Sequence, residues 1–171
     1  MLGLKRGIVK LIPHQKEWQA EFIKEKEFLH SLLGDTISIE HVGSTAVEGL
    51  LAKPILDIAI GLTSETQEES IFKILSENGY EDRGDDGVLG ENLLVKGDES
   101  NRTHYIHIVK INSPAWNNYI ALRDYLRTHK TAREEYTHLK LELAKKYPKN
   151  RKAYTDGKSD FIETTLKKSY L

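Results

Sequence analysis

The sequence predicts an α+β fold in which a small mixed sheet comes first and a helical part follows. Over residues 1–112, segments rich in β-branched and apolar residues alternate with segments of helical periodicity, whereas residues 113–171 have helical periodicity almost throughout. A chain of 171 residues is long enough to bury a sizeable core. We therefore expect a single domain over residues 1–171, with a sheet-containing core at 1–112 and a basic helical part at 113–171 packed on it.

Strands and helices should alternate at the start of the chain. Residues 7–12 predict a short strand. Apolar residues at helical spacing then predict a helix over about residues 14–33, which Gly34 ends. Residues 36–42 alternate between β-branched and other residues and predict a strand. The nearly continuous apolar segment 55–62 predicts a second strand, in a central position of the sheet.

The next segments are less regular. Residues 64–67 resemble a capping box that opens a helix, and Gly79 should end that helix. Residues 82–101 are rich in glycine and acids, so we expect a loose hairpin or mobile loop around a short strand at 92–96. Residues 104–111 predict a further strand.

The last third of the chain is predicted to be helical, and it is basic. Helical periodicity predicts helices at about residues 115–129, 131–147 and 151–169. Residues 1–122 carry 12 Lys and Arg against 19 Asp and Glu, whereas residues 123–171 carry 13 against 7. This asymmetry indicates either that the two parts pack against each other or that they hold an anionic ligand between them.

The composition excludes several classes of protein. The chain contains no cysteine, which excludes a disulfide framework, a thiolate metal site and a cysteine nucleophile. No segment approaches the roughly 20 apolar residues of a membrane helix, and the first residues lack the apolar core of a signal peptide. We therefore expect a cytoplasmic protein with no membrane partner.

A glycine-serine turn follows the strand expected at 36–42, and a lone acid lies within the strand expected at 55–62. Gly43, Ser44 and Thr45 follow the first strand, where backbone N–H groups and hydroxyls favour a phosphate, although an ordinary turn with an N-cap has the same residues. Asp57 interrupts the second strand, and burying a carboxylate without a partner is costly. Asp57 should therefore sit at a strand end or face a cleft, beside a cation or a metal, or else form a core ion pair with Lys53.

This arrangement resembles the nucleotidyltransferase superfamily, in which such a turn holds nucleotide phosphates and acids on the next strand hold divalent metal. More narrowly, HVGSTAVEGLLAKPILDIAI is similar to the signature of the GrpB family. The later segments RTHYIHIV, WNNYIALRDYLR, YTHLKLELAKKY and RKAYTDGKSDFI are similar to that family's later blocks, in the same order. The resemblance covers almost the whole chain. It implies a nucleotidyltransferase-like fold, a small mixed sheet flanked by helices with a C-terminal helical part, and it suggests metal-dependent nucleotidyl transfer.

The metal site that the resemblance implies is altered in this chain. Residue 59 shares a strand face with Asp57 but is Ala59, so the usual second carboxylate is missing. His104 and His107 stand where a third acid is expected, on opposite faces, and His107 is the better inward candidate. We expect Asp57 and His107 as catalytic residues and Asp57, His107 and His41 as ligands of a divalent Mg, Mn or Zn ion. For each histidine, a satisfied core residue is the structural alternative.

The helical part carries two tyrosine-lysine pairs with a spacing of four residues. Tyr136 with Lys140, and Tyr154 with Lys158, should each lie on one helix face and can donate to an anion. The structural alternative is a solvated basic face with the tyrosines in the core. The predicted phosphate- or ligand-binding residues are Gly43, Ser44, Thr45, Lys53, Arg102, Lys140, Tyr154 and Lys158.

Three functions therefore remain open. The first is binding of a nucleotide or another phosphorylated small molecule, with or without nucleotidyl transfer. The second is a non-catalytic binding or interaction module with a degenerate metal site, which Ala59 favours. The third, nucleic-acid binding, is not favoured because the whole chain has a net charge of −1 and lacks an aromatic-rich strand block for base stacking.

Overall fold

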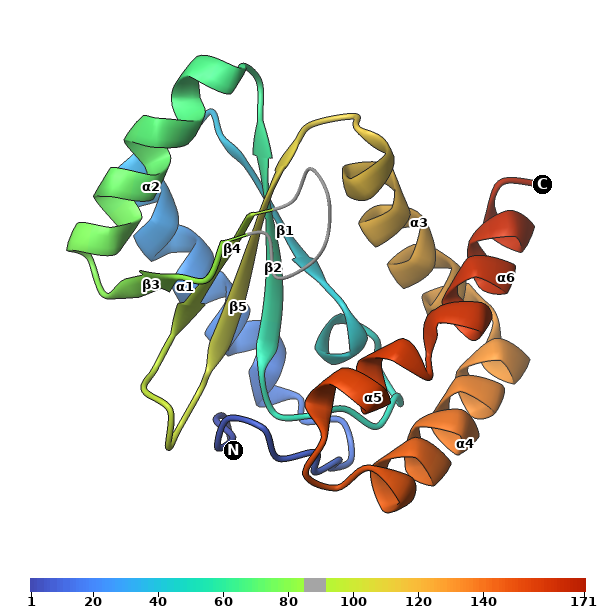
Figure 1. Ribbon diagram of the computed structural model, residues 1–171. Coiled ribbons are helices and arrows are strands. Elements are labelled where there is room, and N and C mark those ends of the chain that lie inside the picture. The colour runs from blue at the N-terminus through green and yellow to red at the C-terminus, as the bar shows by residue number, and fades with distance from the viewer. Residues whose placement is uncertain (85–91) are drawn as a thin grey trace.

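A five-stranded mixed sheet forms the centre of the molecule (Figure 1). The computed structural model describes residues 1–84 and 92–171. The strands are β1 (Ser38–Val42), β2 (Leu56–Leu62), β3 (Tyr80–Asp82), β4 (Asn92–Lys96) and β5 (His104–Lys110). Their order is β1-β2-β5-β4-β3. Strands β2 and β5 pair in parallel and the other neighbours pair antiparallel, so the sheet is mixed, as predicted.

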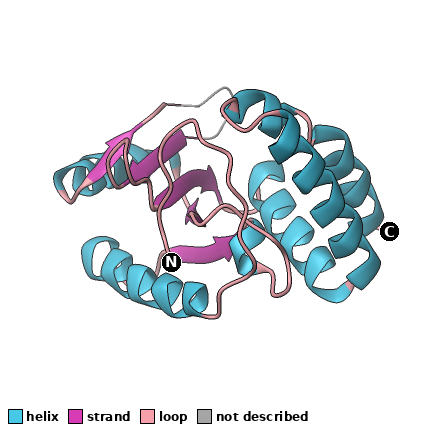
Figure 2. Ribbon diagram, turned by 90° about the horizontal axis from the view of Figure 1, so that it is seen from below, coloured by secondary structure: helices cyan, strands magenta, loops and turns pink. Residues whose placement is uncertain are grey.

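Helices cover both faces of this sheet. Figure 2, seen from below, shows the strands between two groups of helices. One group consists of α1 (Glu17–Leu33) and α2 (Glu68–Glu77); the other contains α3 (Pro114–Thr128), α4 (Lys130–Lys146), α5 (Arg151–Asp156) and α6 (Ser159–Ser169). Short 3₁₀ turns, η1 (Ser44–Ala46) and η2 (Glu65–Gln67), follow β1 and β2. The predicted α+β class is confirmed.

The alternation of side chains along β2 separates a large core from the face that carries the site. Leu56, Ile58 and Ile60 pack with Trp18 and Leu29 of α1 in the larger hydrophobic cluster. The intervening residues of β2 point to the other face, beneath α3, where Ala59 joins a smaller cluster. Because side chains alternate along a strand, Asp57 lies on this second face, towards helices α3–α6.

Most predicted elements are found within a few residues of their expected bounds. The helix expected at 14–33 is α1, and the strands expected at 36–42, 55–62, 92–96 and 104–111 are β1, β2, β4 and β5. The helices expected at 115–129 and 131–147 are α3 and α4, and Gly79 with a positive φ follows α2. The hairpin expected over 82–101 lies partly outside the described residues. No helix among the described residues is long and apolar enough to cross a membrane.

Some local predictions were wrong. Residues 7–12 form no strand, because their backbone amides bond to separate segments: Val9 to Pro148 and Ile12 to Ala52. Ser64 makes no capping bond, and its hydroxyl contacts Thr66 instead.

Two other differences concern short elements. The helix expected at 151–169 is divided into α5 and α6 next to Gly157, where a Cβ atom would collide with Leu143 of α4. Strand β3 has three residues and no recognisable periodicity, and the sequence did not predict it.

Candidate functional site

The glycine-serine turn lies directly against Asp57. Gly43 has a φ of 68°, and a Cβ atom at this position would lie 2.7 Å from Oδ2 of Asp57. Both the left-handed backbone and the close approach therefore require glycine. The pairing of Val42 with Asp57 in the β1–β2 register brings the end of β1 to this carboxylate. The predicted turn and the predicted acid are thus neighbours in space.

Asp57 begins a short series of hydrogen bonds. Its Oδ1 lies 3.0 Å from Nε2 of His107 on β5, and Nδ1 of His107 lies 3.0 Å from the hydroxyl of Tyr119 on α3. The side chains of Asp57 and His107 are 29% and 15% exposed, so both reach the wall of a cavity. The series joins β2, β5 and α3.

Asp57 is held in its ionised form. Burial alone would raise the pKa of this carboxyl group. The hydrogen bond and charge of His107 and the charges of Lys53 and Lys158 outweigh burial, so that the pKa lies below its ordinary value. Because a carboxylate can only accept, Nε2 of His107 donates to Asp57; in the neutral ring, Nδ1 then accepts from the Tyr119 hydroxyl.

A buried lysine fixes the serine of the turn. Lys140 of α4 is 1% exposed, and its Nζ donates to Oγ of Ser44 at 3.1 Å and to the carbonyl of Leu51. The ammonium lies 4.7 Å from the ring centroid of Tyr136, whose hydroxyl also bonds Ser44. Burial, with the nearby charges of Lys158 and Lys53, holds the pKa of Lys140 well below its ordinary value.

Three further cations lie over tyrosine rings. Lys53 is 5.8 Å from the ring centroids of Tyr105 and Tyr154, Lys158 is 4.7 Å from that of Tyr154, and Arg151 is 4.9 Å from that of Tyr105. Burial and the neighbouring cations lower the pKa of Lys53 to about 7. Burial also lowers the pKa of Lys158 to about 8, although Asp57 opposes this. Ring faces hold a cation without neutralising it, so the positive potential of the cluster persists.

These groups line one cavity of about 450 Å³ between the sheet and helices α3–α6. Its described lining residues include five Lys or Arg and one acid, Asp57. One of the five, Arg123, is paired with Glu40 and Asp124. Nine of the residues singled out from the sequence line the cavity: Gly43, Ser44, Thr45, Lys53, Asp57, His107, Lys140, Tyr154 and Lys158.

His41 does not join Asp57 and His107, so the predicted three-residue metal site is corrected. In the β1–β2 register His41 lies opposite Ile58, on the face covered by α1. Its ring stacks on Phe22 at 4.8 Å, and Nε2 bonds Oγ1 of Thr45 at 2.9 Å. Burial lowers the pKa of His41 to about 4. His41 therefore supports the turn from behind as a neutral core residue.

The donor set in the cavity does not fit a metal held by protein ligands. Among residues 1–84 and 92–171, no group of three or more His, Asp and Glu side chains is placed to hold an ion. The Asp57 carboxylate is already bonded to His107 and attracted by lysines. Ala59, on the same strand face, has no donor.

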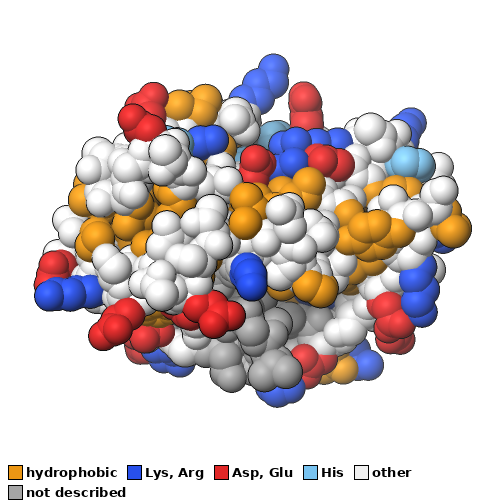
Figure 3. All heavy atoms as spheres, turned by 90° about the horizontal axis from the view of Figure 1, so that it is seen from above, with side chains coloured by type: hydrophobic (Ala, Val, Ile, Leu, Met, Phe, Trp, Pro, Cys, Tyr) orange, Lys and Arg blue, Asp and Glu red, His pale blue; other side chains and the backbone are white. Residues whose placement is uncertain are grey.

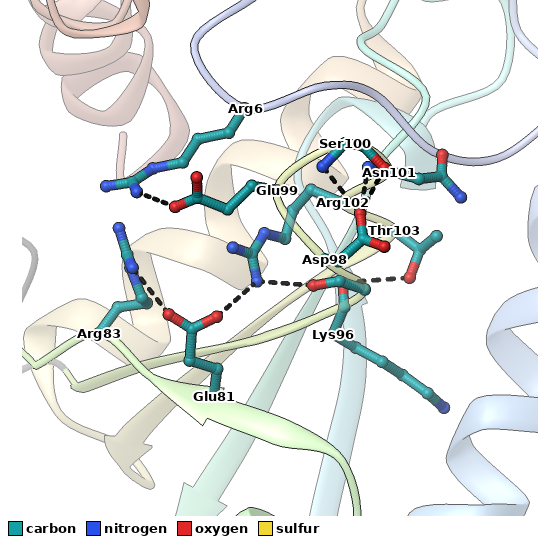
Figure 4. A network of polar contacts seen from close by, with 11 residues as sticks. Arg6, Glu81, Arg83, Lys96, Asp98, Glu99, Ser100, Asn101, Arg102 and Thr103 are labelled. Atoms are coloured by element: carbon teal, nitrogen blue, oxygen red, sulfur yellow. Dashed lines mark hydrogen bonds and ion pairs between the residues drawn. The ribbon is translucent and has the colours of Figure 1, made fainter.

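Arg102 is not among the described residues that line the cavity, so its predicted role in ligand binding is not supported. It is 3% exposed, and its Nη1 donates to the carbonyl of Gly97 at 2.8 Å and to Glu81 at 3.3 Å. Figure 4 shows Arg102 between Glu81 and the turn that contains Asp98. Arg102 is therefore a structural residue of the β4–β5 connection.

Tyr105, Arg151 and Tyr119 line the site but were not singled out from the sequence. Tyr105 precedes His107 by two positions, so the strand period could have identified it. Arg151 precedes Tyr154 by three residues and shares its helix, α5, so helical spacing could have identified it. Tyr119 has no such signal, because its place depends on how α3 packs on the sheet.

Comparisons with known proteins give one consistent family. The model of the family described as GrpB protein matches residues 8–168. Glutamate-rich protein GrpB of Alkalihalophilus pseudofirmus is 35% identical over 171 residues, which cover 97% of this chain and 98% of that protein. UPF0157 protein YqkA of Bacillus subtilis is 34% identical over 91% of this chain, which spans 46% of that relative's length.

Solved structures agree with this result. The crystal structure of conserved protein GrpB from Enterococcus faecalis has a TM-score of 0.83 and 30% identity, covering 94% of this chain and 96% of that one. The Cid1 poly(U) polymerase with Mg 3′-dATP bound has a TM-score of 0.55 and 16% identity, covering 86% of this chain and 49% of that one. At this identity the likeness concerns the fold, and it confirms the predicted nucleotidyltransferase-like architecture.

Proposed function

This chain belongs to the GrpB family, and we propose that it binds a nucleotide or another phosphorylated small molecule in the cavity between the sheet and helices α3–α6. The observation that carries this proposal is the convergence of Lys53, Lys140, Arg151 and Lys158 on a cavity whose described lining contains one acid. Clefts lined by charge of one sign concentrate ligands of the opposite sign.

The electrostatic cost of bringing these lysines together supports an anionic ligand. Neighbouring cations and burial lower the pKa values of Lys53 and Lys158, which means that their charged forms are disfavoured in the free protein. A phosphate between them would offset the repulsion among these cations and favour their charged forms. Perturbed lysines of this kind, gathered in a cavity, are typical of functional sites.

The turn supplies directional contacts that complement these charges. Ser44 is oriented by Lys140 and Tyr136, and Gly43 lines the cavity beside it. A hydroxyl and backbone N–H groups at a tight turn suit phosphate oxygens. We propose that the turn binds the phosphate that lies deepest in the cavity. Lys53, Lys158 and Arg151 would bind the phosphates nearer its mouth.

The proposal concerns binding and does not extend to metal-dependent nucleotidyl transfer. Ions that bridge phosphates in such a reaction need carboxylates, and the described cavity lining supplies one, bonded to His107. The lysines and Arg151 supply positive charge in the same place. This donor set agrees with the alternative of a binding module with a degenerate metal site.

Nucleic-acid binding receives less support from the face of the molecule that Figure 3 shows. Figure 3 shows that, on the described part of the face seen from above, Lys and Arg side chains are interspersed with Asp and Glu side chains. A duplex or strand needs a continuous basic stripe that follows its backbone.

A thermal-shift panel tests the proposal. Nucleotides, dinucleotide cofactors and inorganic triphosphate are each added with and without Mg²⁺, Mn²⁺ or Zn²⁺, and a ligand that binds the native state raises the midpoint of unfolding. We expect a phosphate-dependent rise that Lys158→Gln abolishes and Lys149→Gln, an exposed lysine outside the lining, leaves unchanged. A ligand-induced rise that survives Lys158→Gln, or no rise with any of these ligands, would contradict it.

A further inference from the structure

The hydrogen bonds of His107 connect an ionised carboxylate to a phenol. Nε2 faces Asp57 and Nδ1 faces the hydroxyl of Tyr119, each at 3.0 Å. In this arrangement Nδ1 of His107 can accept the proton of the Tyr119 hydroxyl. The order carboxylate, imidazole and hydroxyl is the arrangement that activates a hydroxyl nucleophile, because the carboxylate orients the ring and stabilises its charged form.

We propose that Tyr119 is a nucleophile that accepts a phosphorus-containing group from a phosphoanhydride bound in the cavity, with His107 as its general base and Asp57 as the positioning residue. This inference rests on the proposed function, since it requires a phosphorylated ligand beside the lysines. Tyr119 and His107 both line the same cavity as Lys53, Arg151 and Lys158.

The step balances without a further reagent. The phenol oxygen of Tyr119 forms a bond to a phosphorus of the ligand, and the bond from that phosphorus to the bridging oxygen breaks. The leaving group departs with the electron pair, as diphosphate after attack at the α-phosphorus of a nucleoside triphosphate or as a nucleoside diphosphate after attack at the γ-phosphorus. The phenol proton moves to Nδ1 of His107. The product is a phosphate ester on Tyr119, and the cationic wall stabilises the charge that develops on the leaving group.

The other tyrosines of helices α4 and α5 in the cavity are less suited to this role. Burial raises the pKa of Tyr136, as does Asp57, and the Tyr136 hydroxyl is bonded to Ser44. Burial also raises the pKa of Tyr154, whose ring lies beneath Lys53 and Lys158. Tyr119 differs from both because a histidine lies within hydrogen-bond distance of its hydroxyl.

The test is covalent labelling followed by mass spectrometry of the whole protein and of its peptides. The protein is incubated with ATP, GTP, CTP or UTP, in MgCl₂ or in EDTA. The proposal predicts one added group per chain, on Tyr119. A nucleotidyl increment identifies attack at the α-phosphorus and a phosphoryl increment attack at the γ-phosphorus; either supports the proposal.

Variants separate the base from the nucleophile. Tyr119→Phe should abolish labelling, whereas Tyr125→Phe, on the same helix but outside the lining, should leave it unchanged. His107→Gln keeps a polar side chain without a base and should slow labelling about 100-fold. The unfolding midpoint of each variant shows whether it is folded, and its nucleotide-induced shift shows whether the cavity still binds.

The outcomes distinguish this inference from the proposed function. A wild-type protein that shows a nucleotide-induced shift but no label on Tyr119 would overturn the inference and leave binding intact. Labelling that persists in Tyr119→Phe, or that is as fast in His107→Gln, would also overturn it. If no nucleotide shifts the unfolding midpoint and no label forms, both proposals fail.

Discussion

The affinity for a phosphorylated ligand should fall steeply as the pH rises from 7 to 9. This rise in pH deprotonates Lys53 and Lys158, whose pKa values are lowered to about 7 and about 8. An anion binds their protonated forms, and the free protein loses those protons within this range. Binding therefore takes up protons, and affinity decreases with increasing pH.

The magnitude follows from the two pKa values. Between pH 7 and pH 9 the protonated fraction of Lys53 falls about fiftyfold and that of Lys158 about tenfold. If the ligand requires both charges, its dissociation constant rises about 500-fold, which corresponds to about 4 kcal/mol. At pH 7.5 the two lysines together lack about one proton, so binding should take up about one proton per ligand.

Isothermal titration calorimetry measures both quantities. Inorganic triphosphate is titrated at pH 7 to 9, and repetition in buffers of different ionisation enthalpy gives the number of protons taken up. Lys149→Gln should preserve all of the pH dependence, whereas Lys158→Gln should show no measurable binding at any of these pH values. An affinity that changes less than threefold across this range, with no proton uptake in the wild type, would refute the assignment of these lysines to the phosphates.

Three further predictions concern the turn, the core histidine and the excluded arginine. Gly43→Ala should lower the free energy of unfolding in urea by about 1–3 kcal/mol more than Gly49→Ala, because both positions have a positive φ but a Cβ collides with Asp57 at the first and meets nothing at the second. An equal loss would show that the contact with Asp57 has no cost. The stability of the wild type should decrease by about 2 kcal/mol between pH 7 and pH 5 through His41, since the pKa of this buried ring is about 4 in the folded state against 6.5 unfolded. In urea titrations, the His41→Gln variant should not show this loss of stability between pH 7 and pH 5. An equal loss in the variant would contradict the prediction. Arg102→Met should reduce stability but leave the dissociation constant of triphosphate within about twofold, because its partners lie outside the cavity; a tenfold weaker constant would restore Arg102 to the site.

Several of the correct predictions depend only on local periodicity. The alternation along β2 places Asp57 and Ala59 on one face, and the alternation along β5 separates His104 from His107. These relations follow from the sequence spacing alone. Tyr136 and Lys140, both on α4, likewise follow from helical spacing. Tyr154 and Lys158 do not share one helix face as predicted, because α5 ends at Asp156 between them, although the Lys158 ammonium still lies over the Tyr154 ring.

The residues that were misplaced depend on tertiary arrangement. His41 directly precedes the turn, yet the register of β1 against β2 directs it to the face of α1. Arg102 precedes β5, but the turn after β4 captures its guanidinium. Tyr119 reaches His107 only because α3 crosses that face of the sheet. Strand register and helix packing are set by long-range contacts, which the spacing of residues in one sequence does not record.

A crystal structure of this chain with a bound nucleoside triphosphate would test the central claim most directly. We predict phosphate oxygens within hydrogen-bond distance of Ser44 and of the ammonium groups of Lys53 and Lys158. Phosphates bound instead in the separate surface hollow lined by Arg127 and Arg133, with the lysine-lined cavity holding solvent, would contradict it.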